Sequence, residues 1–397
     1  MNSRLDVFIK RIKVISAGGA ARMLMTLNGV ILSFVVVRTQ SPALWGQLVY
    51  YFLILDFGFS IVSWGATHYL LREFSLNPKR MKLDLGQSIS SRSLLLALLL
   101  LAISFLPTTV TLKIVLIVWA SSRFVHQGFE PLAQVERHFY FTLFIELIAL
   151  VIVLVPLLLN TVDIEGLVIL FTLSMLVRAV AFAFFYRRQI SFQRPSLQYF
   201  KDAFPFLLLT FSAIVQQRMD LYCVAYYLNE PDTAAYQIFI NFLIFCQYAS
   251  SLLLMPYAKN IFRLSPSSLL KLEHQFMLAG IFLSAIAIGL VFILTRVLYH
   301  FYFPWPLYLT GYFYVLMIYL YLLRNYEMRK ASRIMHVAAY SFLSGLVNLL
   351  FSILLIPELG LGGALLSGLI AQVFIVILYH GAKVPVLGRR LRSFIKP

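Results

Sequence analysis

Long, uninterrupted apolar segments separated by short polar links dominate the pattern of this chain. An α-helix needs roughly 20 residues to cross the hydrocarbon core of a bilayer, and the segments are about that long. They lack the alternation typical of strands, and backbone groups in lipid must bond one another, so the pattern predicts helices rather than a barrel. Links containing Pro or Gly separate twelve predicted helices. Their ranges are residues 14–37, 47–71, 86–106, 110–130, 139–159, 164–186, 204–228, 233–255, 274–298, 307–323, 334–356 and 361–381.

The composition agrees with a chain made of membrane helices. Of the 397 residues, 61% are hydrophobic and 12% are charged, which is more apolar than a water-soluble domain of this size needs. The links are also too short to form a separate catalytic module. The predicted class is therefore an all-α integral membrane protein with about twelve transmembrane helices.

The two halves of the chain show a faint internal repeat. The link over residues 41–46 follows the first predicted helix, and a similar link over residues 230–235 follows the seventh. Parallel repeats of this kind are typical of transporters with their site between two halves. We therefore expect two six-helix halves, residues 1–190 and 191–397, around a central cavity.

Lys and Arg residues gather in alternate links, as the retention of positive charge on the cytoplasmic side predicts. The N-terminus, every second link and the C-terminal tail carry 26 of the 33 Lys and Arg residues, with Arg92 counted in the link after the second helix. The opposite links carry only Arg38, Lys113 and Arg296. Both termini are therefore expected in the cytoplasm. Topology and anionic lipid headgroups account for the net charge of +17, so no nucleic-acid partner is expected.

Four arginines fall deep within apolar segments, where topology does not explain them: Arg22, Arg123, Arg178 and Arg218. A charge at the centre of a membrane helix costs roughly 2.5–3.5 kcal/mol, so it normally faces a water-filled cavity or a partner. Guanidinium groups bind phosphate through two parallel hydrogen bonds. A cavity lined by these arginines would suit an anionic, phosphate-bearing substrate.

Acidic and amide side chains accompany the arginines in the apolar segments. They are Asp56, Glu146, Gln216, Gln217 and Asp220. Helical spacing places Gln216, Gln217 and Asp220 on one face, with Arg218 pointing elsewhere, which favours Asp220 as part of an interhelical polar network. Two interpretations stay open: arginines paired internally with Asp or Glu to fix helix packing, and a cavity with a surplus of positive charge.

Motif searches give no sign of catalysis or of a cofactor. The sequence has no phosphate-binding loop ending in Gly-Lys-Ser or Gly-Lys-Thr, no His-Glu-x-x-His and no pair of cysteine doublets. Its two cysteines, Cys223 and Cys246, fall inside predicted helices and suit packing rather than metal binding. We expect no metal and no cofactor. Coupling to protons or sodium ions through Asp56, Glu146 or Asp220 stays open.

Three stretches of the chain carry a family resemblance. They are VVVRTQSPALWGQLVYYFLILDFGFSIVSWGATHYLLRE, FPFLLLTFSAIVQQRMDLYCVAYYLNEPDTAAYQIFINFLIF and LIPELGLGGALLSGLIAQV. They resemble the bacterial polysaccharide flippases, the O-antigen and capsule repeat-unit transporters of the multidrug, oligosaccharidyl-lipid and polysaccharide exporter superfamily. Pro205, Asp220 and the link Glu230-Pro231-Asp232 match the family's pattern for the seventh helix, whereas Asn229 stands where a glycine is usual.

The resemblance implies a multi-pass protein of the cell inner (plasma) membrane that is not an enzyme. Such a flippase moves an undecaprenyl-diphosphate-linked oligosaccharide to the outer leaflet by alternating access. The oligosaccharide is a repeat unit of O-antigen, which is part of lipopolysaccharide, or of another surface polysaccharide. Arg22, Arg123, Arg178 and Arg218 would meet the diphosphate and sugar. The implied partners are the lipid-linked oligosaccharide, membrane lipid and polysaccharide assembly proteins.

Two other functions remain as alternatives. A multidrug or cation antiporter of the same superfamily should favour acidic and aromatic cavity residues, and the arginine surplus argues against it. A membrane glycosyltransferase or polymerase acts on the same lipid-linked sugar but typically carries a large outer loop. The short outer links of this chain argue against that enzyme class.

Overall fold

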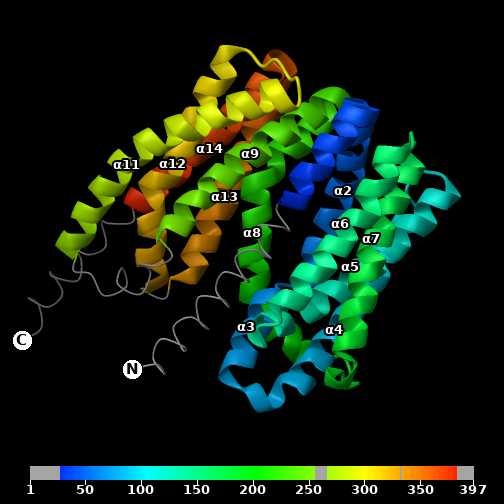
Figure 1. The fold of residues 1–397 in the computed structure, drawn as a ribbon. Coiled ribbons are helices and arrows are strands. Elements are labelled where there is room, and N and C mark those ends of the chain that lie inside the picture. The colour runs from blue at the N-terminus through cyan, green and yellow to red at the C-terminus, as the bar shows by residue number, and fades with distance from the viewer. Residues whose placement is uncertain (1–26, 255–265, 331–332, 382–397) are drawn as a thin grey trace, which may run out of the picture. The chain divides into compact units, whose positions relative to one another are not determined.

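The computed structural model describes residues 27–254, 266–330 and 333–381, and every long element in these ranges is a helix. Most of the first predicted helix, 14–37, lies outside the described residues, and its described part belongs to the helix Leu27–Gln40, which ends in a π-helical turn. The other helices, drawn in Figure 1, are α2 (Pro42–Ser63), α3 (Ala66–Leu76), α4 (Met81–Ser104), α5 (Val110–Val135), α6 (Phe139–Leu159), α7 (Ile164–Phe185), α8 (Leu197–Tyr227), α9 (Glu230–Leu254), α11 (Pro266–Ile293), α12 (Trp305–Lys330), α13 (Ile334–Leu359) and α14 (Leu361–Gly381).

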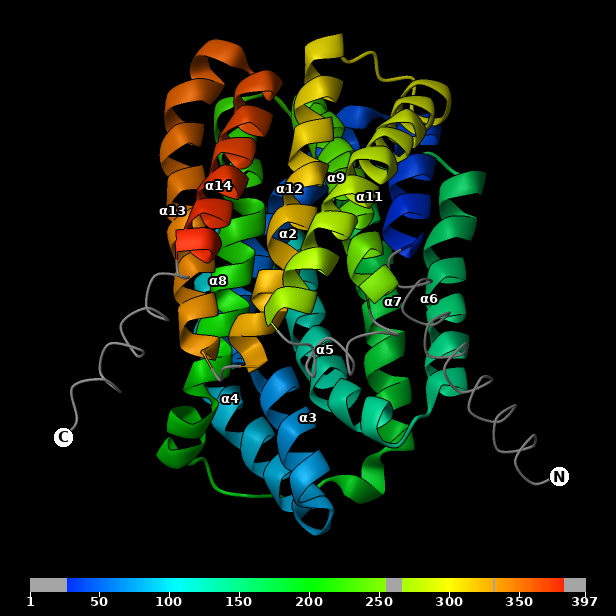
Figure 2. The ribbon, with the colours of Figure 1, turned by 90° about the vertical axis from the view of Figure 1, so that its left-hand side faces the viewer.

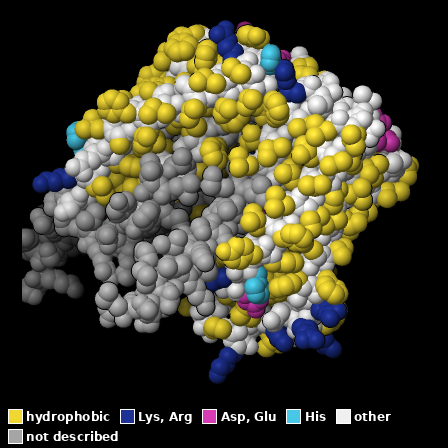
Figure 3. All heavy atoms as spheres, in the orientation of Figure 1, with side chains coloured by type: hydrophobic (Ala, Val, Ile, Leu, Met, Phe, Trp, Pro, Cys, Tyr) yellow, Lys and Arg dark blue, Asp and Glu magenta, His cyan; other side chains and the backbone are white. Residues whose placement is uncertain are grey.

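These helices make the chain an all-α protein rich in segments suited to lipid. Within the described ranges, eight helices are long and apolar enough to cross a membrane. Large apolar side chains such as Leu98, Phe144 and Ile377 are more than half exposed on them. On the face in Figure 3, hydrophobic side chains cover most of the described helix surface and Lys and Arg side chains gather toward helix ends. A helix occurs in each predicted range, while twelve crossings and cytoplasmic termini stay predictions.

The chain divides into two compact units, Met1–Thr210 and Phe211–Pro397, and the division falls inside α8. The first turns of α8 belong with unit 1 because they bond to it directly. The Trp64 indole Nε1 donates to the Phe200 carbonyl oxygen at 3.0 Å, and the Ser88 hydroxyl donates to the Tyr199 hydroxyl at 3.0 Å.

In unit 1, α5 lies against α3, α4 and α7, and Figure 2 shows α3 and α4 beside it. Phe129 and Leu132 of α5 share one buried cluster with Leu70 of α3 and Phe182 of α7. These residues lie on the buried face of each helix because apolar residues three or four apart share a helix face. This packing fixes the rotation of α5 about its own axis. It therefore also fixes the direction of Arg123, which lies six residues before Phe129 in the same helix.

In unit 2, α14 packs along α12 and α13 (Figure 2). The turn between α13 and α14 is so tight that a Cβ on Gly363 would lie 2.2 Å from the Leu355 carbonyl oxygen. Buried polar side chains also join the two helices. The Ser367 hydroxyl of α14 donates to Asn348 Oδ1 of α13 at 3.1 Å and lies 2.7 Å from the Ser352 hydroxyl.

The predicted continuous helix over 47–71 is wrong at one point, because Trp64 and Gly65 break it into α2 and α3. Both residues have left-handed backbone angles, with φ of 44° and 68°. The break lies directly on α8, since a Cβ on Gly65 would come within 2.4 Å of the Leu207 backbone nitrogen. Gly65 therefore satisfies a conformational and a steric requirement together.

Replacing Gly65 by alanine is expected to destabilise unit 1 by about 2 kcal/mol or more, because the Cβ meets backbone atoms and the positive φ is strained. The midpoint of thermal unfolding of the purified protein measures the effect. Gly289→Ala is the control, since a Cβ at Gly289 meets nothing within 4 Å. Equal midpoints for the two variants would contradict the proposed tight contact.

Candidate functional site

Three of the four predicted arginines lie in described helices, and Arg22 lies outside the described residues. Arg123 belongs to α5, Arg178 to α7 and Arg218 to α8. The first two belong to unit 1 and the third to unit 2. The three guanidinium groups have very different surroundings, which decide what each can do.

Arg178 is fully engaged by its neighbours. Its Nε and Nη2 donate to the two oxygens of Glu146 at 3.0 and 2.9 Å, and its Nη1 donates to the Ser174 hydroxyl at 2.7 Å. Asn28 donates a further bond to Glu146 at 3.2 Å. The Glu146 side chain is only 4% exposed. This bidentate pair ties α6 to α7 and leaves little capacity for a ligand.

Arg123 forms a looser ion pair. Its Nη1 donates to Asp56 Oδ1 of α2, and this is its one hydrogen bond within the described part of the chain. The guanidinium carbon also lies 4.8 Å from the ring centre of Phe59 and 4.9 Å from that of Trp119. The side chains of Arg123 and Asp56 are 29% and 48% exposed. Arg123 therefore keeps free donors at an accessible place.

Arg218 has an amide partner in place of a carboxylate. Its Nη1 donates to Asn241 Oδ1 of α9 at 3.0 Å, and no ion pair involves Arg218 among the residues that the structure describes. Its exposure is intermediate. A guanidinium with one hydrogen-bond acceptor keeps most of its five donors for another group.

The other polar residues of α8 bond mainly to α9. Asp220 is 1% exposed, and its Oδ2 accepts a 2.5 Å hydrogen bond from the Tyr236 hydroxyl. Gln217 Oε1 accepts a long bond of 3.4 Å from the Tyr248 hydroxyl, whereas Gln216 lies against Tyr321 of α12. The Asp220 contact joins two helices, as an interhelical polar network requires. Arg218 and Gln217 are partly exposed and Tyr248 is exposed, whereas Asp220 is enclosed.

Two buried arginines have no place in the sequence-based site. The charge tally assigned Arg92 to a link, although the predicted range 86–106 includes it. In the structure α4 begins at Met81, and Arg92 lies within that helix and is 0% exposed. Its Nε donates to the Ser88 hydroxyl at 3.1 Å, and its charge lies 5.1 Å from the Phe124 ring centre. Its two terminal nitrogens have no hydrogen-bond partner among the described residues. In the sequence, the four-residue spacing of Ser88 and Arg92 was the signal that could have indicated this contact within one helix.

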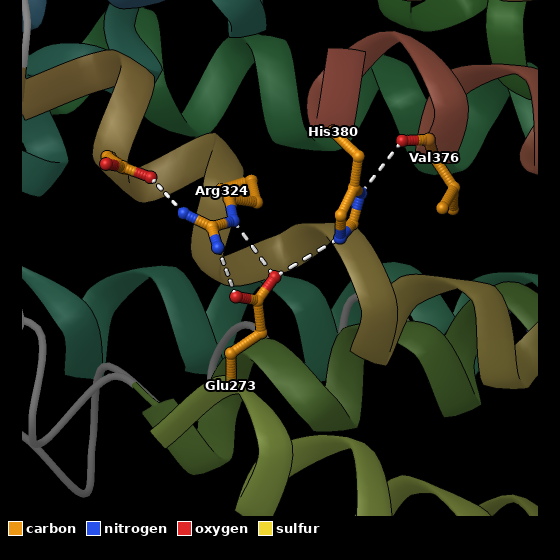
Figure 4. Close-up of polar contacts among 5 residues, drawn as sticks. Glu273, Arg324, Val376 and His380 are labelled. Atoms are coloured by element: carbon orange, nitrogen blue, oxygen red, sulfur yellow. Dashed lines mark hydrogen bonds and ion pairs between the residues drawn. The ribbon is translucent and has the colours of Figure 1, made fainter. Parts of the chain in front are cut away.

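The second missed arginine, Arg324, lies one residue beyond the predicted range 307–323 and inside α12. Figure 4 shows Arg324 facing Glu273 of α11, and Glu327 of its own helix is its second acidic partner. Its Nε donates to Glu273 at 2.9 Å and its Nη1 to Glu327 at 2.7 Å. His380 of α14 also reaches Glu273, with Nε2 3.3 Å from Oε1. Three helices of unit 2 therefore meet at one carboxylate.

His380 has a polar partner at each ring nitrogen. One ring nitrogen lies 2.9 Å from the Val376 carbonyl oxygen and the other faces the Glu273 carboxylate (Figure 4). Glu273, Arg324, Glu327 and His380 thus form one closed polar cluster that joins three helices of unit 2.

Replacing Glu273 by glutamine is expected to destabilise unit 2 by about 3 kcal/mol or more, because Arg324 is only 6% exposed and keeps a single carboxylate. Glu327→Gln is the matched control, since the Glu327 side chain is 44% exposed and its loss should cost about 1 kcal/mol or less. Thermal unfolding of both variants measures the difference. Equal shifts would show that Glu273 does not hold the three helices together.

Comparison with known proteins gives likeness in fold and none in sequence. No family model matches the chain, and no curated protein matches it. The lipid II flippase MurJ, in an inward closed conformation, has a TM-score of 0.64 at 15% identity over 94% of this chain and 87% of that one. An inward-facing MATE family multidrug resistance transporter of the MOP superfamily gives 0.63 at 12% identity, over 93% of this chain and 96% of that one.

A further MATE structure, in a bent conformation, gives a TM-score of 0.59 at 11% identity, with 96% of each chain covered. This chain shares their fold. Identities of 11–15% establish fold and leave the substrate open. The likeness therefore concerns the fold alone, and membership of the polysaccharide flippase family stays a proposal.

Proposed function

We propose that the chain is a transporter that flips an undecaprenyl-diphosphate-linked oligosaccharide across the cell inner membrane by alternating access. The observation that carries the proposal is Arg218, a partly exposed guanidinium within an apolar chain whose described partner is the Asn241 amide. A cation with no carboxylate at ion-pair distance among the described residues suits, in such a setting, an anion that binds and leaves. A fold shared with the lipid II flippase MurJ supports a lipid-linked substrate.

In this proposal, different polar groups bind different parts of the substrate. Arg22 and Arg123 in unit 1, and separately Arg218 in unit 2, each offer donors to a diphosphate, and Gln217 and Tyr248 offer hydrogen-bonding groups to the sugar. Arg178, with every donor group occupied, acts with Glu146 as structural support rather than as a ligand. Asp220 joins α8 to α9. The polyprenyl tail stays in lipid, and both chain termini lie in the cytoplasm.

A multidrug or cation antiporter remains the second candidate, because the MATE likeness has a TM-score of 0.63 and the Asp56 carboxylate is 48% exposed. A cationic drug would seek that carboxylate, whereas a diphosphate would seek Arg123 and Arg218. The two substrates therefore predict opposite effects of removing each charge.

The decisive experiment deletes the gene in its own host and examines the envelope. Loss of a surface glycan together with accumulation of the lipid-linked repeat unit supports the flippase. Reconstituted vesicles carrying a fluorescent polyprenyl-diphosphate oligosaccharide then test transport directly, and a cationic dye in the same vesicles tests the antiporter. Unchanged glycan with increased dye sensitivity would overturn the proposed substrate.

A further inference from the structure

The ion pairs that Arg123 and Arg178 form in unit 1 are built in contrasting ways. Glu146 and Arg178 join through two hydrogen bonds, and further bonds from Asn28 and to Ser174 complete the set. Asp56 reaches Arg123 through a single oxygen, and its side chain is 48% exposed against 4% for Glu146. The first pair is a closed structural contact. The second is open to exchange with a solvent-borne anion.

Aromatic rings rather than the carboxylate hold Arg123 in place. Trp119 lies one turn before Arg123 on α5, and its ring stacks on Phe52 at 5.3 Å and meets Phe59 edge-on at 5.8 Å. The guanidinium lies about equally close to Phe59 and Trp119, at 4.8 and 4.9 Å. Such cation–π contacts persist when a counter-ion leaves. Loss of the Asp56 contact should therefore leave the guanidinium where it is.

Asp56 lies on the same helix face as Phe59, three residues earlier in α2. Its carboxylate therefore occupies one edge of a guanidinium whose face is covered by rings. A phosphoryl oxygen has the same charge sign and acceptor geometry as that carboxylate oxygen, and it can take two parallel donors where Asp56 takes one. The carboxylate thus stands where a phosphoryl group would bind.

We infer that Asp56 is a resident counter-ion of Arg123. The diphosphate of the substrate displaces the Asp56 carboxylate on binding, and the return of that carboxylate to Arg123 releases the diphosphate. This inference rests on the proposed function. The resident carboxylate reduces the cost of an uncompensated cation in an apolar segment when no substrate is bound. It also weakens substrate binding, because the substrate must displace an anion already present.

The consequence for transport is a balance between capture and release. Without the Asp56 charge, an anion should bind more tightly and leave more slowly. Binding free energy shared equally by every state of a transport cycle does not speed the cycle. Asp56→Asn is therefore expected to raise affinity while lowering turnover, which is a result that loss of a merely structural contact does not give.

The binding test uses the full-length protein in lipid nanodiscs with farnesyl diphosphate as the probe. The Asp56→Asn protein is expected to bind with a Kd about tenfold lower than the unmodified protein, because one competing charge is removed. Asp163→Asn is the matched control, since it removes one negative charge of unit 1 from the α7 N-cap, and asparagine can still accept from the Gly166 backbone nitrogen. The control should bind as the unmodified protein does.

A double variant ties the effect to the pair. In an Arg123→Gln background, Asp56→Asn should no longer change the Kd, because the charge that Asp56 occupies is gone. Asp56→Ser is measured beside Asp56→Asn, so that misfolding of one variant does not decide the result. Thermal unfolding of each variant confirms that it is folded.

The outcomes separate this inference from the proposed function. Tighter binding by both Asp56 variants, lost in the Arg123→Gln background, supports the counter-ion role. Measurable binding that Asp56 variants leave unchanged or weaken overturns the counter-ion role and leaves the proposed function standing. Absence of diphosphate binding in every variant overturns both.

Discussion

Replacing Arg218 by alanine is expected to reduce transport of the lipid-linked oligosaccharide about a hundredfold, because the substrate loses charge-assisted hydrogen bonds that no neighbouring cation of α8 replaces. Asn241 is neutral, so its loss of contact with Arg218 leaves no unpaired charge at that position. Asp220 also lies within reach of the Arg218 charge, so insertion and the midpoint of thermal unfolding are measured beside transport. Flipping in reconstituted vesicles and the amount of surface glycan in cells measure the effect.

Arg188→Ala is the control for this variant. Arg188 is exposed in the short 3-10 helix Arg187–Gln189 after α7, so its removal takes away the same charge from a place outside the proposed site. It should transport normally. Arg123→Ala is expected to behave like Arg218→Ala. Full transport by both the Arg218 and Arg123 variants would contradict an anion-binding site built from arginines.

Replacing Glu146 by alanine is expected to destabilise the protein by about 3–5 kcal/mol, since Arg178 would keep a buried charge with no carboxylate among its present partners. Asn28 would lose its bond to the same side chain. The midpoint of thermal unfolding and the yield of inserted protein both measure the loss. Asp56→Ala is the comparison, because its half-exposed pair should contribute about 1 kcal/mol or less.

A compensating change tests the interpretation of Glu146. The double variant Glu146→Leu/Arg178→Leu removes both charges and keeps apolar volume, so it should recover much of the lost stability. Transport by the double variant is then informative as well, because Arg178 is assigned a structural role. An unaltered unfolding midpoint in Glu146→Ala would show that the buried pair does not hold α6 against α7.

The positions of the helices were predictable because an apolar run is a local property of the sequence. The predicted ranges 139–159 and 361–381 coincide with α6 and α14 at both ends. Proline and glycine near the links, such as Ser41-Pro42 before α2, mark helix starts with a known backbone reason. The break at Trp64 and Gly65 escaped prediction, because a single glycine inside a continuous apolar run looks the same in a straight helix.

The partners of the arginines could not be predicted, because they depend on how helices are rotated against each other. Arg178 pairs with Glu146, 32 positions away, and Arg123 with Asp56, 67 positions away. The sequence left internal pairing and a cationic cavity as alternatives, and the geometry gives Arg178 a closed pair and Arg218 no carboxylate. Arg92 and Arg324 were counted with links because a charge tally does not distinguish a link from a buried helix turn.

The spacing of these polar contacts along the chain bears on how the protein is made. Three of them join helices that follow one another directly: Glu146 of α6 with Arg178 of α7, Arg218 of α8 with Asn241 of α9, and Glu273 of α11 with Arg324 of α12. Each can form within a single helical hairpin as it leaves the insertion machinery, so the charged helix enters lipid already neutralised or solvated by its neighbour.

The contact between Asp56 and Arg123 cannot form within a single helical hairpin, because α3 and α4 are synthesised between α2 and α5. Trp119, one turn away in the same helix, is a partner that Arg123 has available before α5 docks on α2. The Asp56–Arg123 pair, which we expect the substrate to separate, is thus also a pair that cannot form during synthesis until α5 reaches α2.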